Sequence, residues 1–514
     1  MLDGILAGRT VERPFVTRAD VVVVGSGAGG AVVARELARA GRDVVVVEEG
    51  GYYAPEEYAA MTPSNTFRRL AREAALGAAV GLGETPLVAV MSGKCVGGSS
   101  VLTGGVCFRV PEEVHDEWVS RLGLVAMGAR ALEPHYRAIE SAVHVETVPD
   151  ALRSRGTDLF VEGADKLGIP MRPLRRNTHG CRGEGRCNFG CPRRAKMSVD
   201  VSMLPEAVAN GARILSDALV ERVEIAGGRA VGVRGRFRSE STGEPGVPFH
   251  VEADLVVVAC GALHTPLLLR RSGLRSRHLG RHLTLHPSTR VFALFDERLD
   301  GWDGAFQSVY SDHFFRSDGI TLISAFGPPS LLAAGFPGVA ARHRDYVRRL
   351  PFTAAFGALI HDDGGGRVHR WLSREPLVTY RMSARDRVRL FRAMRILADM
   401  AFAAGAKEVI LPVFGAPTMR TPADVASFFA APPSARRAES VSFHPLGSAR
   451  MSMRPEEGVV QPTGETWAAR NLFVADGSVI PTSIGVNSQL PIMAIAHRIA
   501  QGIADRRATA PRTR

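Results

Sequence analysis

The sequence predicts an α/β protein of two domains, one built on a parallel sheet from segments far apart in the chain and one with a mostly antiparallel sheet. Three observations support this: a glycine-rich turn between two valine runs near the N-terminus, a second strand–glycine–helix pattern in the middle, and an apolar helical pattern near the C-terminus. With 514 residues, 45% of them hydrophobic and 23% charged, the chain can bury two globular cores.

The first unit reads "VVVVGSGAGGAVVARELARAGRDVVVVEE". The runs Val21 to Val24 and Val44 to Val47 predict buried parallel strands. The stretch "AVVARELARA" between them predicts a helix that ends at Gly41. This strand–turn–helix–strand order is typical of a Rossmann-like dinucleotide site.

Five residues of this unit are candidate ligands. Gly25 permits the tight turn, Gly27 lets a pyrophosphate approach the backbone, and Gly30 lets helix and strand pack closely. The diphosphate would lie on the helix N-terminus. Glu48 can accept hydrogen bonds from ribose hydroxyls, and Glu49 is less suited because Glu48 leaves the strand first.

The motif alone does not distinguish NAD from FAD, although its place near the N-terminus of a long chain favours FAD. Three later segments bear on the choice. The first, "GKCVGGSSVLTGGVCFRVPEEVHDEW", has little side-chain bulk and suits a large flat ligand. The second is "ADLVVVACGALHTPLLLRRSGL", and the third comprises "SFHPLGSARM" and "NLFVADGSVIPTSIGVNSQLPIMAIAHRIAQGIA".

Together these segments resemble the glucose–methanol–choline (GMC) family of FAD-dependent oxidoreductases. Thr103 stands where the family usually has asparagine, and Arg275 where it usually has glycine. "DGSVIPTSIGVN" is most similar to the cholesterol oxidase and long-chain-alcohol oxidase branches. The resemblance implies an FAD-binding domain over 1–286, with substrate-side segments near 110–180, a substrate-binding domain over 287–436, and a C-terminal part of the FAD-binding domain over 437–514.

The resemblance also implies which residues hold the cofactor. Gly97 to Ser100 and Thr103 would run past the isoalloxazine, Val220, at the end of a strand, would meet the adenine, and Asp476 would reach the ribityl–phosphate region. Leu102 occupies the place of a histidine that binds FAD covalently in some members, so we expect non-covalent FAD. The full implied set is Gly25, Gly27, Gly30, Glu48, Gly97, Gly98, Ser99, Ser100, Thr103, Val220, Asp476 and Gly477.

Two further residues match the family's catalytic positions. Alcohol oxidation removes a hydroxyl proton and a hydride, the latter going to flavin N5, and needs a base with a pKa near working pH. His444, in "FHPLGSARM", matches the active-site histidine. Asn487, in "GVNSQLP", would hold the substrate oxygen. The alternative is a purely structural role, in which Asn487 only caps the following helix. The N-terminus of that helix would stabilise negative charge on the reduced flavin.

Cys181, Cys187 and Cys191 lie close together, and His179 could complete a set of four metal ligands. Neither spacing is the C-x2-C of common zinc or iron–sulfur sites. A similar segment occurs in the long-chain-alcohol oxidase-like branch, so we predict a structural loop and no metal. The cluster His361 to Asp363, followed by three glycines, is predicted to be a solvated hairpin turn. His286, before Pro287, is predicted to mark the crossover into the substrate domain.

The predicted function is FAD-dependent oxidation of a lipophilic or bulky alcohol to its carbonyl, with oxygen or another acceptor reoxidising the flavin. The alternatives are a lyase or photodecarboxylase of the same fold, or an electron-transfer protein with a metal cluster. The net charge is +12, but the sequence has no lysine-rich run of the kind that nucleic-acid-binding proteins carry, so we expect no nucleic-acid partner. No apolar stretch approaches the ~20 residues that span a bilayer, and six cysteines are few, so we expect a cytoplasmic protein without stable membrane insertion.

Overall fold

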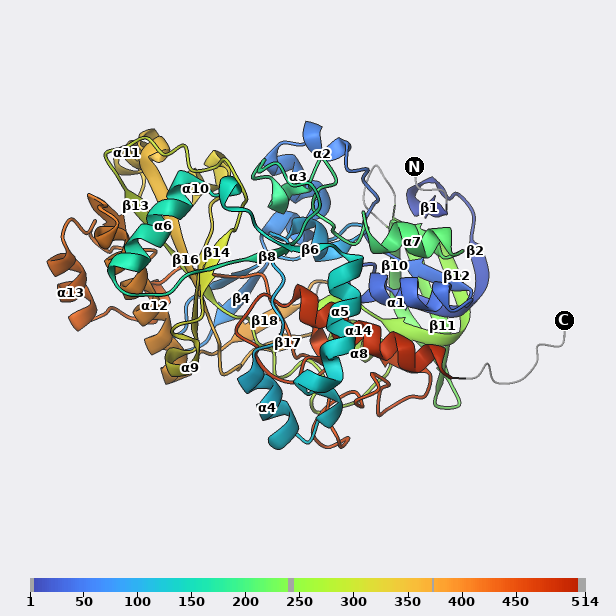
Figure 1. The fold of residues 1–514 in the computed structure, drawn as a ribbon. Helices are drawn as coiled ribbons and strands as arrows, with labels where there is room; N and C mark the ends of the chain where they lie inside the picture. The colour runs from blue at the N-terminus through green and yellow to red at the C-terminus, as the bar shows by residue number, and fades with distance from the viewer. Residues whose placement is uncertain (1–3, 239–244, 372–373, 507–514) are drawn as a thin grey trace.

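The computed structural model describes residues 4–238, 245–371 and 374–506, and two large sheets form its two halves (Figure 1). The first sheet has the order β1-β9-β3-β2-β12-β11-β10, with β21 on β12. Its strands are β1 (Ile5–Ala7), β2 (Phe15–Val24), β3 (Val44–Val47), β9 (Arg213–Ser216), β10 (Ala218–Ala226), β11 (Arg229–Arg238), β12 (Pro245–Val258) and β21 (Leu472–Val474).

The parallel centre of this sheet confirms the Rossmann-like prediction. β2 pairs in parallel with both β3 and β12, and all eight valines of the predicted runs are buried. Helix α1 (Ala28–Arg39) follows β2, and α8 (Gly261–Arg271) follows β12. Helix α14 (Gln489–Ala504) packs against α1 and against α5 (Ala129–Ala142).

One predicted strand position is wrong. We expected Val220 at the end of a strand, but the chain breaks at Asp217, whose φ of 53° lies outside the extended region. β9 therefore ends at Ser216, and Val220 is the third residue of β10. The break redirects the chain from a parallel strand to an antiparallel one.

The second sheet has the order β17-β18-β4-β5-β20-β13-β16-β15-β14-β7, with β19 on β13. It is mostly antiparallel, as predicted, and among the strand pairs of the described residues only β18–β4 and β20–β5 are parallel. Its strands are β4 (Ala78–Gly81), β5 (Val88–Val90), β7 (Arg172–Pro173), β13 (Ser288–Leu294), β14 (Val309–Ser311), β15 (Ile320–Ser324), β16 (Thr353–Ile360), β17 (Arg367–His369), β18 (Leu377–Tyr380), β19 (Glu408–Ile410) and β20 (Ser440–Ser442).

Helix α12 (Ala384–Ala403) covers this second sheet. It begins at a capping box of Ser383 and Asp386, and it packs against β13, β16 and α6 (Arg155–Lys166). β6 (Val145–Thr147) and β8 (Arg175–Asn177) form a separate small sheet. The other helices are α2 (Glu57–Ala60), α3 (Pro63–Leu70), α4 (Glu112–Ser120), α7 (Met203–Ala209), α9 (Phe315–Asp318), α10 (Pro329–Ala334), α11 (Ala340–Arg348) and α13 (Pro422–Ala430). Among the described residues no helix combines the length and apolarity that a membrane crossing needs.

Candidate active site

A cavity of about 860 Å³ is lined by residues from both sheets. It brings together nearly all of the site residues predicted from the sequence, although they come from distant parts of the chain. Gly30 and Gly97 are the two that do not line it. Those that do are Gly25, Gly27, Glu48, Gly98, Ser99, Ser100, Thr103, Val220, His444, Asp476, Gly477 and Asn487.

The glycines of the first turn serve different ends. Gly25 has a φ of +100°, and a Cβ on Gly30 would lie 1.9 Å from the Gly25 carbonyl oxygen, so both are needed by the turn itself. A Cβ on Gly27 would meet nothing within 4 Å except the Cα of Gly98, at 3.9 Å. Gly27 therefore borders open space in the cavity, next to the loop of Gly98.

The two glutamates after β3 have different partners. Glu48 accepts hydrogen bonds from the backbone N–H and hydroxyl of Ser26 (3.0 and 2.7 Å) and from the N–H of Gly50 (2.9 Å), and burial raises its pKa. Burial alone would also raise the pKa of Glu49, but nearby arginines lower it well below its usual value. Arg72 and Arg374 cause this lowering, and Arg238 also pairs with the Glu49 carboxylate, so both of its oxygens are bound.

Two buried cationic side chains, which sequence reasoning missed, donate hydrogen bonds to backbone carbonyls of the loop 97–105. Lys196 Nζ donates to the carbonyl oxygens of Val101 (2.6 Å), Thr103 (3.0 Å) and Cys187 (2.7 Å). Arg176 Nε donates to the carbonyl of Gly104 (2.7 Å). Both side chains are 1% exposed, and burial lowers the pKa of Lys196 to about 8. The positive charge of this pair thus lies next to the loop that lines the cavity.

The cysteine segment supports the same loop. Cys187 Sγ accepts a hydrogen bond from Arg176 Nη2 (2.8 Å), and Cys191 Sγ accepts one from the N–H of Lys196 (3.4 Å). Asn188 lines the cavity, and its Oδ1 has no hydrogen-bond partner among the described residues. In this part of the chain no set of three or more His, Cys, Asp or Glu side chains is grouped as metal ligands would be.

His444 and Asn487 enter the cavity with unpaired polar atoms. Within the described residues, neither Nδ1 of His444 nor Oδ1 of Asn487 has a hydrogen-bond partner, although both atoms are buried. Burial, together with the nearby His286, lowers the pKa of His444 to about 3, so the ring is neutral at neutral pH. Buried polar atoms normally have a partner, so a molecule in the cavity is expected to supply it.

The prediction that Asn487 might cap the last helix is wrong, because α14 begins at Gln489 and Ser488 occupies the N-cap position. Gln489 was missed by sequence reasoning, although a polar residue opening an apolar helix was a usable signal. Its Oε1 accepts from the hydroxyl of Thr103 (2.9 Å), whereas its Nε2 is buried and finds no acceptor in the described parts of the chain. Gln489 thus joins the loop 97–105 to the start of α14 and lines the cavity.

The side of the cavity formed by the second sheet is largely apolar. Aromatic and aliphatic side chains from β15, β16, α10 and the neighbouring loops face it. They are Phe306, Ile323, Phe326, Leu331, Leu332, Phe356, Leu359 and Phe443.

Comparison with known proteins identifies the family. A family model described as GMC oxidoreductase matches residues 19–288 at the N-terminal side and 370–496 at the C-terminal side. The chain is a GMC oxidoreductase. This GMC oxidoreductase is 40% identical, over 492 residues, to the uncharacterized GMC-type oxidoreductase MT0511/MT0512 of Mycobacterium tuberculosis, covering 96% of this chain and 76% of the relative. It is 29% identical, over 532 residues, to the long-chain-alcohol oxidase FAO4A of Arabidopsis thaliana, covering 97% and 70%.

Solved structures agree on the fold. Pyridoxine 4-oxidase from Mesorbium loti matches with a TM-score of 0.70 at 20% identity, covering 94% of this chain and 98% of the neighbour. A formate oxidase variant of Aspergillus oryzae, studied for FAD modification, matches with a TM-score of 0.71 at 18% identity, covering 95% and 98%. The protein is therefore an oxidoreductase with the two-domain GMC fold, and its family consists of FAD flavoproteins.

Proposed function

We propose that this GMC oxidoreductase oxidises a lipophilic alcohol to its carbonyl compound, using FAD that is bound without a covalent link. The single observation that carries the proposal is the pair of unpaired polar groups on His444 and Asn487, which line one cavity with the glycine turns of the nucleotide site. The site fits FAD because Gly27 borders open space, Glu48 directly follows β3 and lines the cavity, and the two buried polar groups have no partner among the described residues.

In the proposed reaction, His444, Asn487 and the loop 97–105 would have different roles. When bound, the flavin accepts the hydride that leaves the carbinol carbon. His444 is neutral at neutral pH, so its imidazole can take the hydroxyl proton, although its pKa of about 3 lies below the value near working pH that best suits a base. The Asn487 carboxamide would hold the same oxygen, which fixes the alcohol for the transfer. The cations Arg176 and Lys196 hold the loop 97–105 that lines the cavity.

The apolar lining supports a lipophilic substrate. Residues such as Phe326, Leu332 and Phe356 offer few polar partners to a sugar-like alcohol. Several relatives, including FAO4A, are long-chain-alcohol oxidases, which favours the same class of substrate here. We infer a cytoplasmic location because all six cysteines are free thiols. Oxygen or another electron acceptor would reoxidise the reduced flavin.

The test is anaerobic reduction of the flavin by a panel of primary alcohols of increasing chain length, with glucose and choline as polar controls. We expect bleaching by the long-chain alcohols and little by the polar ones. Bleaching by none of them would contradict alcohol oxidation and favour a reaction of the lyase or photodecarboxylase type.

Acid precipitation tests the mode of FAD attachment. Leu102 lines the cavity and cannot form the histidyl link known in the family, so all of the flavin should appear in the supernatant. Flavin retained in the washed pellet would show that another residue holds it covalently.

A further inference from the structure

The segment 483–485 precedes Asn487, and its backbone is bound by side chains from the second sheet. His361 Nε2 donates to the carbonyl of Ser483 (3.1 Å). His286 Nε2 accepts from the N–H groups of Ile484 (3.0 Å) and Gly485 (3.2 Å). The hydroxyl of Thr321 donates to the carbonyl of Gly485 (3.2 Å). Four polar groups of this backbone segment therefore form hydrogen bonds with side chains at one end of the second sheet.

These side chains come from one end of the sheet. β13 and β15 both pair antiparallel with β16, so the starts of β13 and β15 lie beside the end of β16. His286 lies two residues before β13, Thr321 is the second residue of β15, and His361 directly follows β16. The sheet thus presents three polar side chains to a single short segment.

Asp362 completes this arrangement. The sequence predicted that His361 to Asp363 form a solvated turn, and this is wrong because Asp362 is only 2% exposed. Its carboxylate accepts four hydrogen bonds, and within the described residues it makes no ion pair. The donors are the N–H of Leu285 (3.1 Å), the N–H of His286 (3.2 Å), the hydroxyl of Tyr380 (2.6 Å) and the hydroxyl of Ser483 (2.8 Å).

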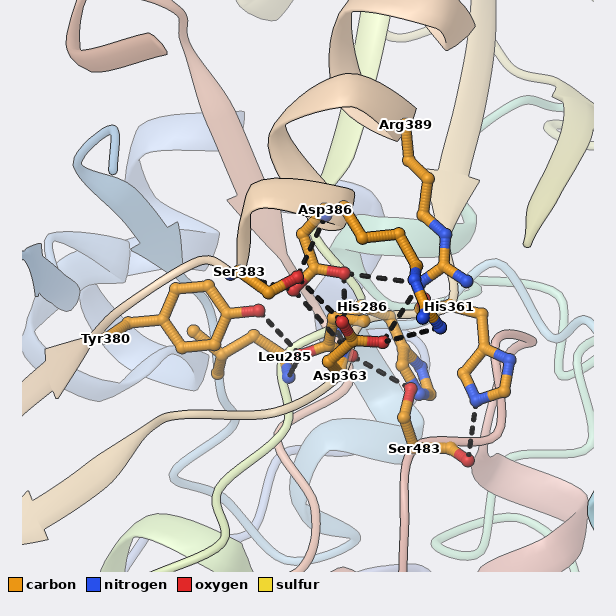
Figure 2. A network of polar contacts seen from close by, with 11 residues as sticks. Leu285, His286, His361, Asp363, Tyr380, Ser383, Asp386, Arg389 and Ser483 are labelled. Atoms are coloured by element: carbon orange, nitrogen blue, oxygen red, sulfur yellow. Dashed lines mark hydrogen bonds and ion pairs between the residues drawn. The ribbon is translucent and has the colours of Figure 1, made fainter. Parts of the chain in front are cut away.

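The network also holds His286 in an unfavourable conformation. His286 has a φ of 47°, although it precedes Pro287, and a residue before proline normally stays extended. Figure 2 shows Tyr380, Ser483 and His286 converging on the same region from different segments. His286 is fully buried, and its ring lies 5.6 Å from the ring of His444. Strain that persists only because the surroundings impose it suggests a function.

We propose that His286, Thr321, His361 and Asp362 form a clamp that positions the segment leading to Asn487. The clamp fixes the catalytic segment of the FAD-binding domain to the end of the substrate-domain sheet. Its members are positioning residues, since they act through Asn487. This inference rests on the proposed function of Asn487.

Amide hydrogen exchange tests the clamp without any substrate. The variants are His286→Asn, since asparagine tolerates a positive φ but is too short to reach the segment, and Asp362→Asn, which replaces acceptor oxygen by a donor. We expect a peptide covering residues 481–487 to exchange about tenfold faster in both, as the loss of one or two hydrogen bonds implies. Asp363→Asn is the matched control, because Asp363 contacts Ser383 and Arg389 but not the segment.

Flavin reduction by a long-chain alcohol tests the consequence. In His286→Asn and Asp362→Asn, FAD content should stay near the wild-type value while reduction at saturating alcohol slows about 10- to 100-fold, as a misplaced reacting group implies. Adding Asp362→Asn to Asn487→Ala should cause little further loss, because the clamp acts through Asn487. A loss that multiplies fully with that of Asn487→Ala would contradict the proposal.

Other outcomes are equally decisive. Unchanged exchange in both variants would show that there is no clamp, and faster exchange with wild-type reduction would show that it does not position Asn487. If no alcohol reduces the wild type, the proposed function fails and exchange alone decides the clamp. If both variants misfold, Thr321→Val, which removes a single hydroxyl without changing the shape of the side chain, is expected to raise exchange at residues 481–487, and no rise would overturn the proposal.

Discussion

His444 and Asn487 are the residues whose chemistry can be tested most directly. If His444 takes the hydroxyl proton, His444→Ala should slow anaerobic flavin reduction by about 10²- to 10⁴-fold, the usual contribution of a positioned base. Asn487→Ala should also slow it. Because Ser488 and not Asn487 occupies the N-cap, Asn487→Ala should cost little stability. Stopped-flow reduction of both single variants and the double variant measures these losses.

The double variant distinguishes a shared role from two separate ones. His444 and Asn487 are proposed to act on one substrate oxygen, so their losses should not add. FAD content serves as the control, since the nucleotide turns lie elsewhere on the cavity wall. Near-wild-type reduction in His444→Ala would remove that histidine from the mechanism.

The candidate ligand residues could be predicted from the sequence, and the residues that support them could not. Gly27, His444 and Asn487 stand in short motifs, and the motif places them correctly on the cavity. His286 and Asp362 depend on contacts that join residues about 120 to 200 positions apart. No local pattern encodes such contacts, so an acidic turn followed by glycines looked solvated.

The loop 97–105 shows how an element depends on charges from another segment. The carbonyl oxygens of Val101 and Thr103 accept hydrogen bonds from the ammonium group of Lys196, so Lys196→Met should leave these buried acceptors unpaired. We expect a loss of about 1–3 kcal/mol in the free energy of unfolding and weaker FAD retention. Urea unfolding and FAD titration measure the two effects.

A charge-matched control separates this effect from a change in net charge. Lys166→Met removes an exposed lysine at the end of α6, far from the loop in sequence, and should leave both quantities near wild type. Equal behaviour of the two variants would mean that Lys196 does not support the loop. The end of β2 at Val24 was predicted correctly because a buried apolar run ends at a glycine there, but its start at Phe15 lies well before the predicted run. The position of Val220 and the start of α14 were predicted less well, because tertiary contacts set them.

At the scale of the whole molecule, several buried or partly buried histidines have a lowered pKa, and two of them, His286 and His444, lie near the cavity that both sheets line. His286 and His444 both have a pKa lowered to about 3 by burial, and His135 and His282 have one lowered to about 4. The fold class could be predicted from the sequence because apolar runs and glycine turns are local patterns that mark strands and helices. The contacts where the two sheets meet at the cavity could not be predicted, because no sequence pattern shows that a histidine is buried and neutral.

These histidines predict acid sensitivity. Above pH about 6.5 they are neutral in both the folded and the unfolded chain, so they cost nothing. As the pH falls below 6.5 the unfolded chain binds protons that the folded chain refuses, so each buried histidine lowers the free energy of unfolding by up to about 1.4 kcal/mol per pH unit until its folded pKa is reached. Carboxylates with a raised pKa oppose this loss. Asp386, with a pKa raised to about 6, does so between pH 6 and 4, and Glu48, Asp200 and Asp476 act in the same direction.

Urea unfolding at saturating FAD between pH 7.5 and 4.5 measures the balance. The wild type should lose stability steadily below pH 6.5, since the histidines with a lowered pKa outnumber the carboxylates with a raised pKa. His444→Gln removes one titrating ring, so its loss should be shallower by up to about 1.4 kcal/mol per pH unit. The exposed His313 is the matched site, and His313→Gln should follow the wild-type curve. Parallel curves for His444→Gln and the wild type would show that the ring of His444 is already accessible to protons in the folded enzyme, and this would argue against the dry, neutral base on which the proposed reaction depends.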